Sequence, residues 1–207
     1  MPSTARETAH TTKEQMGART DRVLVVDIEC TCWETREEQG DRPNEIMEIG
    51  ICELVMKTGE IRDASGYVVK PRFTEVSPFC TQLTGWTPEE IAEGSDIADV
   101  LKAIERDYGI TREDVWFSCG EYDRVKLSSE GRAGVGGLYG IKRHDNPFSL
   151  MRSHFNIKTL FALKYRLNKE MAMDRMLQFI GQPLEGRHHN GCDDAYNIAK
   201  LVRHVLA

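Results

Sequence analysis

Hydrophobic residues form short, dense runs in the first half of the chain and wider, helical spacings in the second half. Residues 23–30 open with four consecutive apolar side chains, three of them valine, which indicates a strand buried on both faces. Residues 46–56 and 61–69 are two more runs of strand length, separated by a turn at 58–60. The short connections favour an antiparallel meander. Residues 115–120 add another short apolar strand.

Helix signals lie between and after these strands. Ser77 and Thr87 each precede a proline, so both are expected to cap short helices, and Gly85 is expected to end the first one. Ser95 is expected to cap a longer helix with apolar residues at positions 97, 100, 101 and 104. Further helices are expected over 149–167 and 169–180, and the methionines of the second are interpreted as core residues.

Acidic residues follow two of the expected strands directly. Asp27 and Glu29 stand two positions apart at the end of the first strand, so they point to the same side of the sheet. Asp123 follows the strand at 115–120, at the edge where open α/β sheets often place their chemistry. Two alternatives remain open at this point. The first pair could be solvated acids at a strand end, and Asp123 could be a helix N-terminal acid favoured by the macrodipole.

The last apolar helical face runs from Ala195 to Val205, which places Asp193 and Asp194 in its first turn and His188 and His189 just before it. One aspartate is readily explained as a helix cap. Two aspartates preceded by two histidines indicate a functional cluster. Carboxylate pairs suit Mg²⁺ or Mn²⁺, because a hard cation relieves their repulsion.

Composition adds few constraints. With 207 residues and 40% hydrophobic content, the chain is expected to form one domain over residues 21–207, preceded by a disordered leader at 1–20. No apolar run approaches the roughly 18 residues of a membrane span, and no secretory signal is present, so we expect a cytoplasmic protein with no membrane partner. The six cysteines lack ligand spacing for zinc and are expected to be reduced thiols.

Two further features limit the functional classes. The net charge of −6 argues against a broad basic nucleic-acid surface, although bound divalent cations would reverse the field inside an acidic cleft. The segment 131–140 holds five glycines in ten residues and is expected to be a flexible loop. It does not match the phosphate-cradling pattern Gly-x-x-x-x-Gly-Lys-Ser/Thr.

Taken together, these segments resemble the DEDDh 3′–5′ exonuclease family, which has a ribonuclease H-like fold. The resemblance rests on five motifs in register: Val-Val-Asp27-Ile-Glu29-Cys-Thr-Cys, Glu-Ile-Met-Glu-Ile-Gly, Leu83-Thr84-Gly85, Ser-Cys-Gly-Glu-Tyr-Asp123 and His189-x₄-Asp194. Within the family, the chain is most similar to the Eri-type RNA exonucleases. Trp86 departs from the smaller aliphatic residue that is usual there, and the glycine-rich stretch resembles an insertion.

The resemblance implies an α/β fold with a central mixed five-stranded sheet, made of the antiparallel meander plus parallel strands and flanked by helices. It also implies two Mg²⁺ or Mn²⁺ ions per active site, held by four acids: Asp27, Glu29, Asp123 and Asp194. His189 would act as the general base, and Asp193 would then be a helix cap. His188 with Asp193 has the same spacing and is the internal alternative.

Substrate contacts are implied in the same way. Leu83 resembles the family residue that meets the terminal base, Thr84 the residue near the sugar, and Thr31 lies beside the acids in sequence. Trp33 and Trp86 are candidates for base stacking, with core or loop packing as the alternative for each.

The implied function is a metal-dependent 3′–5′ exonuclease that hydrolyses single-stranded RNA, or short 3′ overhangs, to nucleoside 5′-monophosphates. A DNA exonuclease of proofreading or repair type is the first alternative, because the metals act on phosphate in both polymers. A non-catalytic family member that binds nucleic acid or protein is the second.

Overall fold

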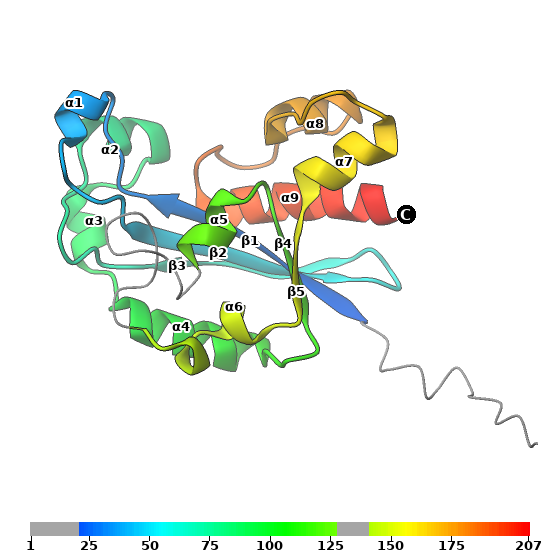
Figure 1. The fold of residues 1–207 in the computed structure, drawn as a ribbon, viewed down its shortest axis with the longest axis horizontal. Helices are drawn as coiled ribbons and strands as arrows, with labels where there is room; N and C mark the ends of the chain where they lie inside the picture. Colours follow the sequence, from blue (N-terminus) through cyan, green and yellow to red (C-terminus); the bar gives the residue numbers. More distant parts are fainter. Residues whose placement is uncertain (1–20, 128–140) are drawn as a thin grey trace, which may run out of the picture.

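The computed structural model describes residues 21–127 and 141–207, and at its centre lies one twisted sheet (Figure 1). The sheet order is β3-β2-β1-β4-β5. The strands are β1 (Arg22–Cys30), β2 (Ile46–Val55), β3 (Ile61–Val68), β4 (Val115–Ser118) and β5 (Ser153–Asn156). β1, β2 and β3 pair antiparallel, whereas β4 pairs parallel with both β1 and β5. The expected mixed sheet of five strands is confirmed.

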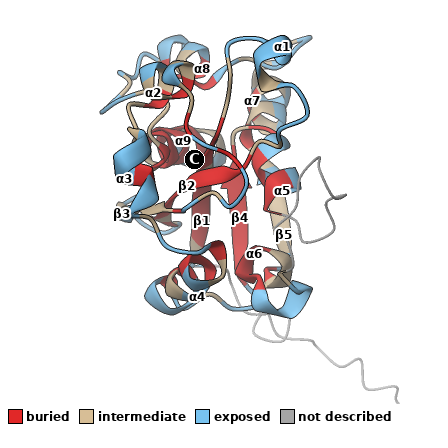
Figure 2. Ribbon diagram, turned by 90° about the vertical axis from the view of Figure 1, so that its left-hand side faces the viewer, coloured by how far each residue is buried: buried red, intermediate tan, exposed pale blue. Residues whose placement is uncertain are grey.

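Helices cover both faces of this sheet (Figures 1 and 2). Those described are α1 (Arg36–Gln39), α2 (Pro78–Thr84), α3 (Pro88–Ala92), α4 (Ile97–Tyr108), α5 (Tyr122–Lys126), α6 (Pro147–Leu150), α7 (Ile157–Tyr165), α8 (Met173–Phe179) and α9 (Gly191–Leu206), with a 3₁₀ turn at Arg143–Asp145. α4 and α6 pack on one face, and α7, α8 and α9 pack on the other. Figure 2 shows β1 and β4 as buried strands between these layers.

The alternation along β1 decides where its acids point. Leu24 and Val26 belong to the core shared with α4, whereas Val23 and Val25 belong to the core shared with α9. Side chains of a strand alternate between faces, so Asp27 continues the row on the α9 side. The apolar run thus fixes both the burial of β1 and the direction of its carboxylates.

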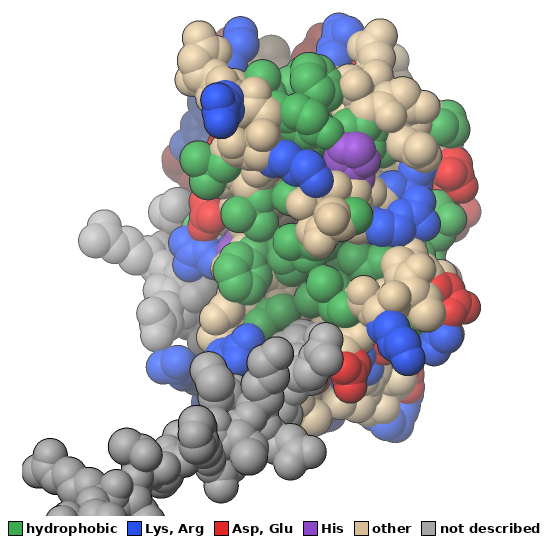
Figure 3. Space-filling model, turned by 90° about the vertical axis from the view of Figure 1, so that its right-hand side faces the viewer, with side chains coloured by type: hydrophobic (Ala, Val, Ile, Leu, Met, Phe, Trp, Pro, Cys, Tyr) green, Lys and Arg blue, Asp and Glu red, His purple; other side chains and the backbone are tan. Residues whose placement is uncertain are grey.

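Helices α7 and α8 expose large apolar side chains at the surface. Phe161, Tyr165 and Phe179 form mutual aromatic contacts, and Leu163 and Phe179 are at least half exposed. Figure 3 views the side that lies to the right in Figure 1 and shows hydrophobic side chains gathered in its middle, with Lys and Arg around them. Met173 and Met176 are buried in the underlying core, which confirms the interpretation of these methionines.

The prediction of one helix over 149–167 was wrong. Helix α6 ends at Leu150, strand β5 occupies Ser153–Asn156, and α7 begins only at Ile157. β5 has four residues, too few to show a period of two. Its strand conformation depends on pairing with β4 from Ser153 to Asn156, which is tertiary information. The next helix, expected from 169, also begins later, at Met173.

The predicted caps were right for the two short helices and wrong for α4. Ser77 and Thr87 accept hydrogen bonds from the backbone N–H groups three residues on, and Gly85 ends α2 in the left-handed conformation. The cap of α4 is Asp96 and not Ser95. The backbone of Ser95 is extended and bridges the end of the meander at Val69, so it cannot also begin a helix.

Two sequence expectations, the leader at 1–20 and the glycine-rich loop at 131–140, lie outside the described residues. Within residues 21–127 and 141–207, none of the helices is long and apolar enough to span a bilayer.

Candidate active site

Two carboxylates at the end of β1 form the base of the site. Asp27 and Glu29 lie on the α9 side of the sheet, and Glu29 is 9% exposed. In the antiparallel ladder Glu29 stands opposite Glu48 of β2, another buried carboxylate. The end of β1 is therefore crowded with acidic groups that are largely withdrawn from water.

Asp123 joins this pair from the first turn of α5, because β4 runs parallel to β1 and α5 follows it at the same edge. Its carboxylate is buried, and Oδ1 accepts a hydrogen bond from the backbone N–H of Ile28 at 3.2 Å. That bond holds the Asp123 carboxylate against β1 at Ile28, the residue between Asp27 and Glu29.

Asp194 comes from the first turn of α9. Carboxylate oxygens of Asp27, Glu29 and Asp194 lie within 4.8 Å of one another. Asp194 Oδ2 accepts the backbone N–H of His189 at 2.8 Å, whereas its buried Oδ1 has no hydrogen-bond partner among the described residues.

Asp193, expected as the cap of α9, has a different role. The cap is Asn190, whose side chain accepts the N–H of Asp193 at 3.2 Å. The Asp193 carboxylate turns back and accepts the N–H of Arg187 at 2.7 Å. It therefore closes the histidine loop, because Asn190 already occupies the position at which a capping side chain can reach the free N–H groups.

Burial and mutual repulsion act on all four carboxyl groups. Burial first, and then the charges of Asp194 and Glu48, raise the pKa of Glu29 to about 8. Burial raises the pKa of Asp123 and of Asp194 to about 6 each, although backbone N–H donors lower them. Desolvation and the neighbouring carboxylates raise the pKa of Asp27 well above its usual range. Without a cation, this cluster holds protons at neutral pH.

The donor set fits a hard divalent cation. Every converging ligand atom of Asp27, Glu29 and Asp194 is a carboxylate oxygen, which Mg²⁺ and Mn²⁺ prefer. A buried carboxylate oxygen without a donor, such as Asp194 Oδ1, is unfavourable unless a cation satisfies it. Cysteine sulfur belongs to none of the candidate metal clusters in the described part of the chain, where all six thiols are free.

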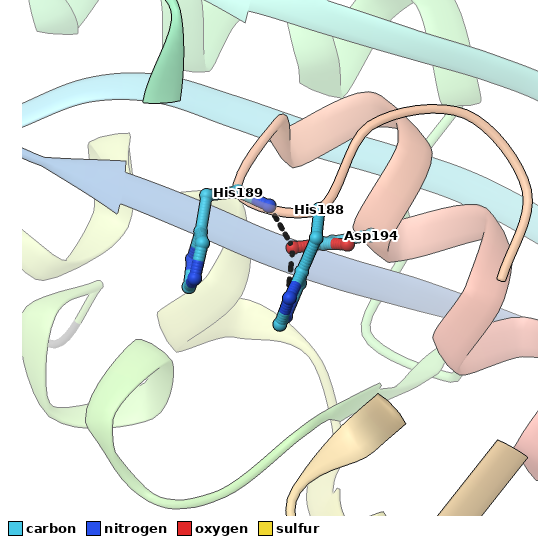
Figure 4. Close-up of side chains that lie close together, drawn as sticks. All are labelled: His188, His189 and Asp194. Atoms are coloured by element: carbon cyan, nitrogen blue, oxygen red, sulfur yellow. Dashed lines mark hydrogen bonds and ion pairs between the residues drawn. The ribbon is translucent and has the colours of Figure 1, made fainter. Parts of the chain in front are cut away.

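The two histidines lie side by side over Asp194 (Figure 4). Their rings stack with centroids 4.0 Å apart. His189 Nδ1 is 3.9 Å from Glu29 Oε1, and His188 Nε2 is 3.9 Å from Asp194 Oδ2. His189 has a left-handed backbone with φ of 66°, which is strained by roughly 1–3 kcal/mol for a non-glycine residue. Its N–H bond to Asp194 holds this conformation.

The residues expected to contact substrate differ in burial and in the hydrogen bonds of their side chains. Leu83 is half-buried at the end of α2. The hydroxyl of Thr84 is buried, donates to Cys80 O at 2.9 Å and accepts the N–H of Trp86. Thr31 is fully buried, and its hydroxyl contacts Thr74 Oγ1 and accepts the N–H of Glu45. Both hydroxyl groups thus serve the scaffold.

Trp33 and Trp86 are both half-buried, and each ring has a polar or charged partner. The Arg42 guanidinium lies 4.7 Å from the centroid of the Trp33 ring. Trp86 donates from Nε1 to Glu48 Oε2 at 2.7 Å. Packing contacts therefore account for the placement of both rings.

Comparison with known proteins finds similar sequences and structures. The Exonuclease (RNase_T) family model matches residues 24–115. Human 3′-5′ exoribonuclease 1 is 27% identical over 196 residues, covering 90% of this chain and 52% of the relative. The nuclease domain of 3′hExo, a DEDDh family member solved bound to rAMP, matches with a TM-score of 0.76 and 26% identity over 90% of this chain and 92% of that one.

A second solved structure, of a 3′-exonuclease in 3′-end specific recognition of the histone mRNA stem-loop, matches with a TM-score of 0.77 and 25% identity. It covers 92% of this chain and 83% of that one. The chain is similar in sequence and fold to DEDDh 3′–5′ exonucleases. The expected ribonuclease H-like fold and the similarity to Eri-type members are confirmed. The chain spans about half the length of the first curated relatives that it matches.

One buried carboxylate beside the acidic cluster was not singled out from the sequence. Glu48 is 1% exposed and accepts two hydrogen bonds at Oε2, from Trp86 Nε1 at 2.7 Å and from the N–H of Gly191 at 2.9 Å. It joins the segment after α2 to the first turn of α9. The available signal was a carboxylate among the apolar residues at 46–52.

Glycines allow this close approach. A Cβ on Gly50 would lie 1.9 Å from the backbone carbon of Gly191, and one on Gly66 would lie 2.6 Å from Glu48 Oε1. β2 and the start of α9 can therefore meet this closely only with glycine at position 50, and glycine at position 66 leaves room for the Glu48 carboxylate. This packing holds the histidine loop and the first turn of α9 against the sheet.

Proposed function

We propose that this protein is a metal-dependent 3′–5′ exonuclease that hydrolyses single-stranded RNA, or short 3′ overhangs, to nucleoside 5′-monophosphates. The observation that carries the proposal is the convergence of Asp27, Glu29 and Asp194 oxygens within 4.8 Å, beside Asp123 and the histidine loop. Similarity to exoribonucleases over about 90% of the chain supports RNA as the substrate.

Nucleases of this family depend on divalent metals. In this chain Asp27, Glu29, Asp123 and Asp194 would hold two Mg²⁺ or Mn²⁺ ions, and Asp27, which faces the other three, is the best placed to contact both. Bound there, the metals would lower the pKa of a water and neutralise charge on the attacking and leaving oxygens.

His189 is proposed to take the proton from the attacking water. Burial and the charges of His188 and Arg187 lower the pKa of its imidazole, so the ring is neutral and able to accept a proton at pH 7. Its backbone bond to Asp194 and the 3.9 Å separation from Glu29 keep the ring beside the acids.

The 3′-terminal nucleotide is proposed to lie against the end of α2, where Leu83 offers a half-buried apolar surface for the base. The related nuclease domain was solved with rAMP, a nucleoside monophosphate. Thr84 and Thr31 are proposed to shape this pocket through the scaffold, because their hydroxyl groups are already engaged.

The test is digestion of matched single-stranded RNA and DNA of one sequence, each labelled in one sample at the 5′ end and in another at the 3′ end. With Mn²⁺ we expect a ladder that shortens from the 3′ end, release of 5′-monophosphates, and faster cleavage of RNA. EDTA should stop it. Faster cleavage of DNA would move the protein to the repair-type alternative, and no cleavage of either polymer with Mg²⁺ or Mn²⁺ would contradict the proposal.

A further inference from the structure

Lys158 lies at the same edge of the sheet as the acids, although no motif pointed to it. β4 and β5 pair in parallel as far as Ser118 and Asn156, so the segments that follow them lie next to each other. A Cβ on Gly120 would lie 3.7 Å from Lys158 Nζ and 4.0 Å from its Cδ and Cε. The Lys158 side chain therefore extends along Gly120, three residues before Asp123, on the α7 side of the sheet where Asp27 points.

The charge of Lys158 reaches the site without being neutralised there. It lowers the pKa of Asp123 and of the Cys119 thiol. Yet among residues 21–127 and 141–207, Lys158 Nζ has neither a hydrogen-bond acceptor nor an ion-pair partner. Lys158 is half-buried, and its charge is thus close enough to influence the acids without being bound by them.

Other lysines that are withdrawn from water in this protein are satisfied internally. Lys126 Nζ donates to Asn44 O at 2.8 Å. Lys200 Nζ donates to Pro183 O at 2.5 Å and pairs with Glu185 at 2.8 Å. Lys158 differs from both because its charged end has no acceptor within the described chain.

Helix stability does not explain the position. Lys158 is the second residue of α7, where a positive side chain is unfavourable next to the free N–H groups of the first turn. The turn is already capped by Asn156, which accepts the backbone N–H of Lys158 at 2.9 Å. The side chain of Lys158 contributes nothing to that cap.

We propose that Lys158 binds a backbone phosphate of the nucleic-acid strand at the active site, an inference that rests on the function proposed above. A phosphodiester entering this edge meets the repulsion of Asp27, Glu29, Asp123 and Asp194, which the metals would offset at the reacting group. Lys158 supplies a positive charge on the β4–β5 side of that group. Lysine suits this task as a point charge on a flexible stem that can follow a phosphate.

The test compares Lys158→Met with Lys158→Arg and with Lys164→Met. Lys164 lies in the last turn of the same helix and donates to the backbone oxygens of His204 and Val205, so it controls for loss of one lysine from α7. Steady-state kinetics are measured with Mn²⁺ on a 5′-labelled pentanucleotide and on a dinucleotide. The salt concentration is varied from about 20 to 300 mM, which spans weak to strong screening.

For Lys158→Met we expect KM for the pentanucleotide to rise about tenfold, the loss of one charge-assisted contact. The negative slope of log(kcat/KM) against log[salt] should become less steep by about 0.7, the contribution of one phosphate contact in a single strand. Lys158→Arg should restore both, and Lys164→Met should change neither. The midpoint of thermal unfolding should stay level or rise for Lys158→Met, whereas a structural lysine would lower it.

The substrate pair locates the contact. An equal loss on the dinucleotide, which has only the scissile phosphate, places Lys158 at that group, and a loss confined to the pentanucleotide places it at a neighbouring phosphate. An unchanged KM and salt slope with both substrates, in a preparation whose parent enzyme is active, would overturn this inference alone. Inactivity of the parent enzyme would instead contradict the proposed function.

Discussion

Acidic side chains lie at both ends of β1, but they are paired with a cation at one end and face one another at the other end. At the first residue, Arg22 pairs with Glu53 at 2.8 Å and with Asp114 at 3.1 Å. Although burial raises the pKa of Asp114, hydrogen bonds from Arg22 and from the N–H of Thr111 bring it below its usual value. At the other end, Asp27 and its acidic neighbours have raised pKa values, and no arginine or lysine within residues 21–127 and 141–207 forms an ion pair with them.

This difference separates a stabilising ion-pair network from a functional cluster. Carboxylates that gain a partner on folding stabilise the native state, whereas carboxylates buried against one another destabilise it until they bind protons or a metal. Charge count alone does not distinguish the two ends. The identity of the facing groups does, and it predicts opposite responses to mutation, pH and metal.

The largest effect is expected at the acidic end. Asp27→Asn should reduce mononucleotide release at least about 1,000-fold, because metal ions supply several kcal/mol of transition-state stabilisation. In EDTA the same variant should unfold about 2–4 °C higher, a gain of about 1 kcal/mol in stability, because the native protein must take up a proton on Asp27 at neutral pH and the amide of the variant need not. Asp99→Asn, on the exposed face of α4, is the matched control and should change neither. Full activity in Asp27→Asn would contradict the site.

The histidine pair gives the next largest effect. His189→Ala should slow turnover by about 10²–10⁴-fold, the usual contribution of a general base, while the increase in unfolding temperature caused by Mn²⁺ is retained. His188→Ala should reduce turnover less than about tenfold by the same measure. Initial rates and thermal scans on the two variants decide which histidine accepts the proton. The reverse order of rates would make His188 the proton acceptor.

The pH dependence of stability follows from the raised pKa values. In EDTA the native acids bind more protons than the unfolded chain, so stability should fall as pH rises from 5.5 to 8.5, through the values of about 6 for Asp123 and Asp194 and about 8 for Glu29. Each proton contributes about 1.4 kcal/mol per pH unit at most. Thermal scans should show this decline and its reversal by Mg²⁺, whose binding releases the protons. A flat profile in EDTA would mean that the acids are not coupled as described.

The smallest effect is expected at the opposite end of the strand. Asp114→Ala should destabilise the protein by about 1–3 kcal/mol, because it leaves Arg22 with one carboxylate partner, Glu53, and Thr111 without its acceptor. Exonuclease activity at 25 °C should be unchanged. Urea titration measures the first quantity, and a matching loss of activity in folded Asp114→Ala would show that the two ends are not independent.

The sequence was sufficient for features that are local. The apolar run at residues 23–26 and the period of two in strands place Asp27 and Glu29 on one side of the sheet, and the apolar face after Ala195 places Asp194 in a first helical turn. The resemblance supplied the remaining topology. Proline and glycine signals located α2 correctly.

Features that depend on tertiary contacts were missed. β5 is too short to show its own period and exists through pairing with β4. Asn190 caps α9 in place of Asp193, a choice made by how the histidine loop enters the helix. Glu48 looks like one polar residue in a strand, and its contacts with Trp86 and Gly191 arise from residues 38 and 143 positions away.

The most direct measurement is a count of the Mn²⁺ ions bound at pH 7.5, from the electron paramagnetic resonance signal of free Mn²⁺ during a titration. The parent protein should bind two ions, and Asp27→Asn should bind at most one, with Asp99→Asn unchanged. This result would establish the acidic end of β1 as a metal centre without reference to any substrate. Equal binding by the parent protein and Asp27→Asn, or none by either, would contradict the account.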